Sequence, residues 1–121
     1  VISDRYLLAG VAFEGFGLVL YPRDIWALGR FASSDVYPAL TFVLDLPVEQ
    51  AASRGGIGRA TGADRLEERE QAFHERVRSG FLQEAAQRAD RIAIVDASGG
   101  VESIQAEIRR LATVFLQAND Q

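Results

Sequence analysis

Two short apolar runs constrain the fold of this chain more than any other feature of its sequence. Residues 40–46 read Leu-Thr-Phe-Val-Leu-Asp-Leu, and residues 91–96 read Arg-Ile-Ala-Ile-Val-Asp. Both are nearly continuous apolar runs without polar alternation, which predicts strands that are covered on both faces. Helical patterns separate the two runs, and strands that alternate with helices form parallel sheets with right-handed crossovers. The sequence therefore predicts an α/β fold.

The segments around these runs predict five helices. The longest is expected over residues 66–88, where apolar side chains recur every four positions. The first is expected to end near residues 15–17, because two glycines in three residues break a helix. Val1 and Ile2 are predicted to be the end of a further buried strand. The remaining predicted helices cover residues 22–32, 47–54 and 101–115.

The composition narrows the classes of function. The net charge is −4, whereas surfaces that bind nucleic acid or anionic membranes need a basic excess. The sequence has no cysteine and one histidine, which argues against thiolate or histidine-rich metal sites. No segment has the length and hydropathy of a membrane span, and no signal peptide opens the chain, so we expect a cytoplasmic protein. All 13 basic residues are arginine, which binds phosphate as a planar fork.

Each predicted strand ends in an aspartate, at Asp4, Asp45 and Asp96. In an open parallel sheet, ligands bind just beyond the carboxyl ends of the strands. Arg5 would there bind a phosphate or carboxylate, and Asp4 would orient a polar substrate group or a metal-bound water. The alternative is a buried Asp4–Arg5 pair that caps the following helix.

A second candidate is the glycine-rich segment at residues 55–64, which contains Arg59 and has Arg54 and Arg65 at its two ends. Phosphoryl transfer depends on cations placed around the transferred group, and an arginine-bearing lid at about residues 54–66 would supply them. The alternative is an ordinary solvated loop between two helices.

Three residues on the predicted helices are further candidates for a binding or metal site. Phe13 and Glu14 precede a glycine at a helix end and could line a pocket for a flat base, or Phe13 could be a core aromatic. His74 follows Phe73 on the long helix, and we expect it to be a partly exposed helix position without a metal.

Six motifs stand in an order that resembles the bacterial thymidylate kinases, P-loop enzymes that phosphorylate dTMP. The resemblance extends over essentially all 121 residues. The motifs are Val-Ile-Ser-Asp-Arg-Tyr at 1–6, Phe-Glu-Gly at 13–15, Leu-Thr-Phe-Val-Leu-Asp-Leu-Pro-Val at 40–48, Arg54 to Arg59 with Asp-Arg-Leu-Glu at 64–67, Phe-His-Glu-Arg-Val-Arg-Ser-Gly-Phe at 73–81, and Ile-Val-Asp-Ala-Ser at 94–98. The resemblance implies a three-layer P-loop kinase fold with a parallel sheet, transfer of a phosphoryl group from ATP to dTMP, and Mg²⁺ bound with ATP.

The resemblance also implies roles for individual residues. Arg5, with Tyr6 beside it, would bind the dTMP phosphate, and Asp4 would orient the acceptor and the ion shell. Phe13 would pack near the deoxyribose and Glu14 near thymine. The arginines that would act on the ATP side and over the transferred phosphoryl group are Arg54, Arg59 and Arg65.

Three positions depart from the family pattern. Glu14 replaces the usual glutamine, and an ionised carboxylate accepts hydrogen bonds but cannot donate them to a base. Leu18 stands where an arginine often follows the Gly-x-Gly segment in the family, and Leu66 replaces an aromatic residue. These changes leave open a related nucleoside or nucleotide kinase of different base specificity.

The phosphate-binding Gly-x-x-x-x-Gly-Lys-[Ser/Thr] loop does not occur in a sequence that lacks lysine and methionine. We therefore expect residues 1–121 to be the C-terminal part of a single P-loop kinase domain, incomplete in its N-terminal strands and inactive as a fragment. A non-catalytic nucleotide-binding relic is the alternative from another class. The family resemblance further implies a homodimer of the complete protein, to which five apolar residues could contribute: Leu8, Val11, Ala12, Trp26 and Phe31.

Overall fold

The computed structural model describes the backbone of residues 1–54 and 64–120 and the side chains of residues 1–54 and 68–120. The architecture is α/β, as the sequence predicts. A π-helical segment, η1, continues directly from the first α-helix. In chain order the elements are α1 (Leu7–Gly10), η1 (Val11–Gly17), α2 (Pro22–Ala32), β1 (Thr41–Asp45), α3 (Val48–Ser53), α4 (Asp64–Gln87), β2 (Ile92–Asp96) and α5 (Val101–Ala118).

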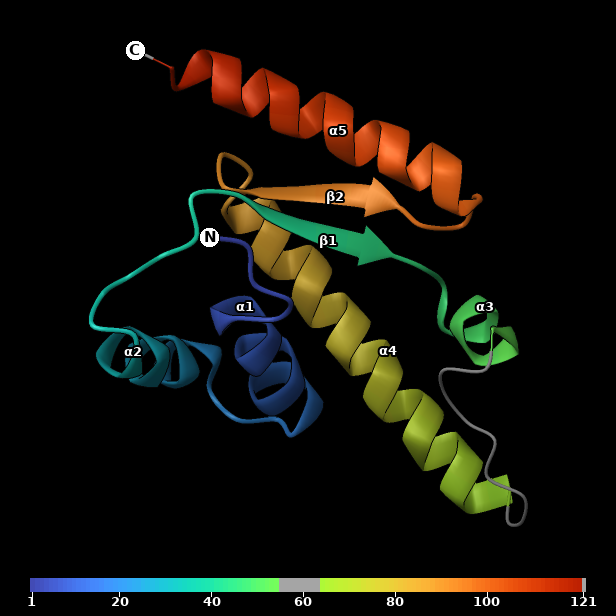
Figure 1. Cartoon of the computed structure of the whole chain (residues 1–121). Coiled ribbons are helices and arrows are strands. Elements are labelled where there is room, and N and C mark those ends of the chain that lie inside the picture. The colour runs from blue at the N-terminus through green and yellow to red at the C-terminus, as the bar shows by residue number, and fades with distance from the viewer. Residues whose placement is uncertain (55–63, 121) are drawn as a thin grey trace.

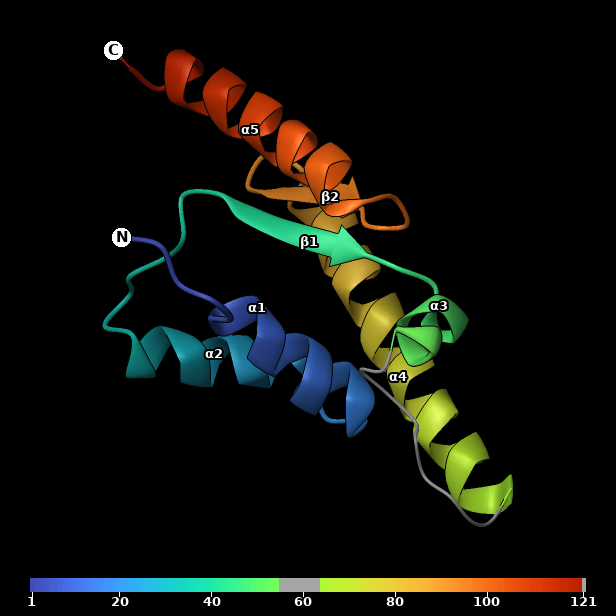
Figure 2. The same cartoon turned by 45° about the vertical axis from the view of Figure 1, so that its right-hand side comes forward.

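The two predicted apolar runs form adjacent parallel strands. β1 pairs with β2 in a register that runs from Thr41 opposite Ile92 to Asp45 opposite Asp96. α5 lies on one face of this sheet, and α1, α2 and α4 lie on the other, which gives three layers (Figures 1 and 2). The helical crossover between the strands explains why two strands distant in sequence can be parallel.

The prediction that Val1 and Ile2 end a buried strand is wrong. Both side chains are fully exposed, and residues 1–3 have no regular secondary structure. Within the described residues the sheet contains only β1 and β2. A strand is stabilised by a hydrogen-bonded neighbour, and these two residues have no such partner there.

The core lies between the sheet and the α1–α4 layer. Four buried side chains form a cluster at its centre: Leu8, Val43, Ala85 and Ile92. Trp26 of α2 and Phe81 of α4 pack against this cluster from the side. The contact made by Phe81 matches the apolar stripe predicted for the long helix.

The structure shows which of the five residues suggested for a dimer interface are buried in the core of the chain. Leu8, Val11 and Ala12 are buried within the chain itself, so their apolar character serves its own core. Phe31 is 89% exposed at the C-terminal end of α2. Of the five, only Phe31 is thus a large exposed apolar side chain.

Two glycines allow α4 to lie directly against η1. A Cβ atom on Gly17 would lie 2.6 Å from Cε2 of Phe73, and one on Gly80 would lie 2.6 Å from the ring of Phe16. Real Cβ atoms do not approach carbon this closely, so both positions require glycine unless the aromatic rings move. Arg76 closes the same junction by donating hydrogen bonds of 3.2 and 3.0 Å to the Gly17 carbonyl oxygen.

None of the helices in the described residues has both the length and the apolar character that crossing a membrane requires.

Candidate functional site

The opening loop places Arg5 in an unusual backbone conformation. Its φ angle is 63°, in the left-handed region that costs free energy for residues other than glycine. The Ser3 hydroxyl donates a 3.1 Å hydrogen bond to the Arg5 carbonyl, and the Tyr6 hydroxyl donates a 3.4 Å bond to the Val36 carbonyl. The loop is therefore held from both sides of Arg5, in a conformation that occurs preferentially at functional sites.

The left-handed turn is accompanied by a contact between Arg5 and Phe13. The Arg5 Cζ atom lies 4.8 Å from the centre of the Phe13 ring, within the range of a cation–π interaction. Phe13 is itself held by two aromatic residues of α4, Phe73 and Phe81, with 6.2 Å between ring centres in each pair. The sequence left open whether Phe13 lines a pocket or belongs to the core. In the structure Phe13 is half-buried, packs against these two rings and lines a cavity.

A cavity of about 290 Å³ begins at Phe13 and extends to the carboxyl end of β1. Its wall is formed by the end of β1, the start of α3 and one face of α4. The lining residues with polar side chains are Asp45, His74 and Arg78. Asp45 is one of the predicted strand-end aspartates, whereas Arg78 was not among the predicted site residues.

Asp45 and Arg78 form a two-pronged ion pair. The Nε atom of Arg78 donates to Oδ1 of Asp45 at 2.8 Å, and Nη2 donates to Oδ2 at 3.1 Å. These hydrogen bonds raise the pKa of the Arg78 guanidinium above its ordinary value, against the opposing effect of burial. The pair joins the carboxyl end of β1 to the middle of α4 and fixes one side of the cavity. Arg78 belongs to the motif at residues 73–81, but the motif does not indicate Asp45 as its partner.

His74 lies one helical turn before Arg78 and lines the same cavity. Its side chain is 19% exposed, which confirms the expected partly exposed helix position. The imidazole packs edge-on against Phe73 at 5.3 Å, and its Nε2 atom lies 4.0 Å from Oε1 of Glu70. Within the described residues, no three histidine, aspartate or glutamate side chains cluster as metal ligands.

Arg54 lies at the other end of α3 and contacts the turn after β2. Its Nη1 atom donates to the Ala97 carbonyl at 2.9 Å, and Nη2 donates to the Ser98 and Gly99 carbonyls at 3.0 and 3.4 Å. The guanidinium thus joins the C-terminal end of α3 to the β2–α5 connection.

Asp96 begins the same turn and is hydrogen-bonded to Ser98. The Ser98 hydroxyl donates to Asp96 Oδ1 at 2.6 Å and the Ser98 backbone N–H donates at 2.9 Å. These bonds, the hydroxyl first, lower the pKa of the Asp96 carboxyl below its ordinary value. Asp45 and Asp96, two of the three predicted strand-end aspartates, lie opposite each other in the register of the sheet.

The other predicted site residues are less constrained. Asp4 and Glu14 are exposed, and a Cβ atom on Gly10 would lie 3.2 Å from Oε2 of Glu14. The alternative, a buried Asp4–Arg5 pair, is absent from the ion pairs of the described residues, and both side chains are exposed. Arg59 lies outside the described residues, as does the side chain of Arg65 and most of the segment predicted as a lid.

Taken together, the chain is an α/β protein in which aromatic residues and the Asp45–Arg78 ion pair line a cavity at the carboxyl end of a parallel strand, and Arg5 contacts the aromatic ring of Phe13 in its wall. This is the usual position of nucleotide sites in open α/β sheets. A family model described as "Thymidylate kinase" matches residues 1–108. The chain belongs to the thymidylate kinase family.

Curated proteins named thymidylate kinase agree with this assignment. One from Clavibacter sepedonicus is 44% identical over 119 residues, which cover 98% of this chain and 56% of the relative. One from Leifsonia xyli subsp. xyli is 44% identical over 109 residues, covering 90% and 51%. One from an Exiguobacterium species is 39% identical over 108 residues, covering 89% and 50%. The chain spans about half the length of these relatives.

Proposed function

We propose that the complete protein containing this sequence transfers the terminal phosphoryl group of ATP to dTMP. The observation that carries the proposal is the position of Arg5, whose guanidinium lies 4.8 Å from the centre of the Phe13 ring beside a cavity at a strand end. The name shared by the relatives supports the substrates, and the six ordered motifs support the assignment of residues.

In this proposal Arg5 binds the phosphate of dTMP through the N–H groups at the edge of its guanidinium. A guanidinium and a phosphate match as a two-pronged, charge-assisted pair. Because the face of the guanidinium stacks on Phe13, its edge stays available for hydrogen bonds. The left-handed backbone conformation of Arg5 sets the direction in which the side chain leaves the loop. Phe13 then offers its ring to the deoxyribose, and Tyr6 holds the loop through Val36.

The acceptor is already a phosphate anion, so the reaction needs positioning and cationic stabilisation more than a general base. On the ATP side we place Arg54, whose contacts with residues 97–99 hold the turn after β2. The family resemblance supports Arg59 and Arg65 as cations over the transferred group.

Mg²⁺ would accompany ATP and neutralise charge on its phosphates. Such an ion is usually held by one or two carboxylates together with the substrate phosphates. The exposed carboxylate of Asp4, next to Arg5, fits that donor set, and we propose that it orients the ion shell and the acceptor.

A coupled assay of ADP release by the complete protein tests the proposal. We expect turnover with dTMP, and we expect Arg5→Gln to reduce kcat/KM for dTMP by about a hundredfold, because two charge-assisted hydrogen bonds are lost. Arg109→Gln removes the same charge from an exposed position on α5 and should leave kcat/KM unchanged. Equal effects of the two substitutions would contradict the role of Arg5.

The exposed Glu14 motivates a comparison of substrates, because a carboxylate at this position changes the hydrogen bonds offered to a base. The same assay with dTMP, dUMP, dCMP and dGMP distinguishes the readings. A preference for a base other than thymine would indicate a related kinase. Absence of turnover with all four would indicate a non-catalytic nucleotide-binding protein.

A further inference from the structure

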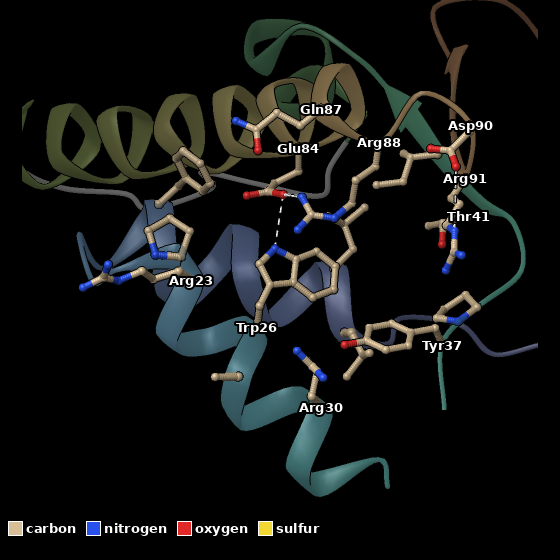
Figure 3. Close-up of a pocket in the computed structure, with 17 residues that line it drawn as sticks. Arg23, Trp26, Arg30, Tyr37, Thr41, Glu84, Gln87, Arg88, Asp90 and Arg91 are labelled. Carbon is tan, nitrogen blue, oxygen red and sulfur yellow. Dashed lines mark hydrogen bonds and ion pairs between the residues drawn. The ribbon is translucent and has the colours of Figure 1, made fainter. Parts of the chain in front are cut away.

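Side-chain hydrogen bonds join α2 and η1 to α4 at two levels of the long helix. Near the C-terminal end of α4, Nε1 of Trp26 on α2 donates a 3.2 Å hydrogen bond to Oε2 of Glu84 (Figure 3). Glu84 is only 4% exposed, and Arg88 forms an ion pair with the same carboxylate. About two turns earlier on α4, Arg76 donates hydrogen bonds of 3.2 and 3.0 Å to the carbonyl oxygen of Gly17, the last residue of η1. Trp26 thus fixes α2 on α4, whereas Arg76 fixes the end of η1.

The Gly17 carbonyl needs a side-chain donor because the next donor of the π-helical series is missing. In a π-helix a carbonyl accepts a hydrogen bond from the N–H five residues later, and here that residue is Pro22, which has no N–H. Gly17 is buried, and a buried carbonyl without a donor is unfavourable. Arg76 supplies the donor with a charged group, so it caps the C-terminal end of η1.

The segment that follows Gly17 gives the end of η1 little other support. The side chains from Leu18 to Tyr21 are all more than half exposed, so they bury little apolar surface. Val19 has a φ angle of 58°, in the left-handed region that is unfavourable for a β-branched residue. Such a conformation persists only where the surrounding contacts impose it. The hydrogen bonds of Arg76 hold the chain immediately before this strained turn.

An aromatic ring between Gly17 and Phe13 connects this junction with the candidate site. Phe73 lies one turn before Arg76 on α4, and a Cβ atom on Gly17 would lie 2.6 Å from Cε2 of Phe73. The centre of the Phe73 ring lies 6.2 Å from that of Phe13, and the Arg5 guanidinium lies 4.8 Å from the centre of the Phe13 ring. If Gly17 moved away from α4, the Phe73 ring would gain space and Phe13 would lose its fixed place beside Arg5.

We propose that Arg76 is a positioning residue for the substrate-phosphate site. By holding Gly17 on α4, Arg76 keeps the Phe13 ring where the Arg5 guanidinium stacks on it. This role rests on the proposed function, in which Arg5 binds the dTMP phosphate. Arg76 contacts no substrate in this arrangement and acts through η1 and the two aromatic rings.

The test measures kcat and KM for dTMP and for ATP with the complete protein. Arg76→Gln should raise KM for dTMP by about tenfold and leave kcat and KM for ATP unchanged, because it misplaces one charge-assisted contact with the acceptor phosphate. A merely structural role would instead lower the folded fraction, which reduces the apparent kcat and leaves KM unchanged. Arg76→Lys retains a cationic donor on a long side chain and should restore much of the affinity for dTMP.

Two further variants test the path from Arg76 to the phosphate. Trp26→Phe removes the hydrogen bond to Glu84 at the other level of α4, and it should lower the urea midpoint of unfolding without changing KM for dTMP. In the Arg5→Gln background, Arg76→Gln should raise KM for dTMP little further, because two residues that act on one contact are not additive.

An NMR measurement separates the positioning role from the proposed function. The Phe13 ring shifts the Nε–Hε cross-peak of Arg5, which is identified by its absence in Arg5→Gln. Arg76→Gln should move this peak toward the position of an arginine without an aromatic neighbour. Absence of dTMP turnover by the unaltered protein would refute the proposed function, and movement of the Arg5 peak would still support the positioning role.

Four results would overturn the role of Arg76. These are an Arg5 cross-peak that does not move in Arg76→Gln, an unchanged KM for dTMP, a reduced kcat at constant KM, and an undiminished increase of KM in the Arg5→Gln background. An equal increase of KM in Trp26→Phe would also overturn it, because any loosening of the helices on α4 would then have the same effect.

Discussion

The ion pair between Asp45 and Arg78 should stabilise the junction of β1 and α4 measurably. The two hydrogen bonds measure 2.8 and 3.1 Å, and the side chains of Arg78 and Asp45 are 33% and 22% exposed. Charge-assisted hydrogen bonds contribute roughly 1.5–3 kcal/mol when well shielded, and exposed pairs contribute about 0.2–1 kcal/mol. Because this pair is partly screened by solvent, we expect a coupling free energy of about 1–2 kcal/mol.

A double-mutant cycle measures this coupling. Asp45→Asn, Arg78→Gln and the double variant are unfolded in urea, and the free energies of unfolding are compared with that of the unaltered chain. With an m-value of about 1–3 kcal/mol per molar urea, each single substitution should lower the midpoint by roughly 0.5–1 M. The double variant should be less destabilised than the sum of the two single variants.

A second ion pair on α5 provides the control. Arg110 and Glu107 also form two hydrogen bonds, of 2.9 and 2.7 Å, but their side chains are 61% and 41% exposed. Their coupling should be much smaller and should vanish at high salt, because exposed charges are readily screened. A coupling for Asp45 and Arg78 no larger than that of the control pair would refute the reasoning.

Three further predictions concern other parts of the structure. Gly80→Ala should lower the free energy of unfolding by about 1–3 kcal/mol in urea titrations, since the new Cβ would lie 2.6 Å from the Phe16 ring; an unchanged midpoint would show that the ring moves without cost. Ser98→Ala should raise the pKa of Asp96 toward its ordinary value in a carboxyl NMR titration. Because the folded-state pKa is lowered, the stabilisation exists above the unfolded-state pKa and is lost as the pH falls through the folded-state pKa, so the variant should lose less stability on acidification. The 121-residue chain itself should release no ADP from ATP with dTMP, since its sequence has no phosphate-binding loop and no lysine; dTMP-dependent release would contradict this.

The helices and strands were largely predictable because their signals are local. The strands at residues 41–45 and 92–96 lie within the two apolar runs, and α4 begins and ends within two residues of its predicted bounds. The prediction of a strand at Val1 and Ile2 was wrong because a strand depends on a neighbouring strand that supplies hydrogen bonds. Two apolar residues carry no information about such a neighbour. The π-helical geometry of η1 was also not predicted, because glycine spacing indicates where a helix ends and not how it is wound.

The candidate site was only partly predictable from residue types. Arg5 and Phe13 were selected by their motifs, and the structure brings them together. Arg78 was missed because its partner Asp45 is 33 residues away in the sequence, and a side chain on the long helix gives no sign of which strand end it will contact. Arg54 was expected on the ATP side, and its hydrogen bonds with residues 97–99 became visible only once α3 and the turn after β2 were adjacent.

The sequence by itself determined the alternation of strands and helices, the parallel sheet and the family, because these depend on local patterns and ordered motifs. The tertiary structure alone decided which charges meet and which apolar residues are core. Leu8, Val11 and Ala12 carry the same apolar pattern as an interface would, and only packing shows that they are buried within the chain. Likewise, an arginine in a motif can bind a phosphate, a carboxylate or a backbone carbonyl, and only its neighbours in space determine which of these it binds.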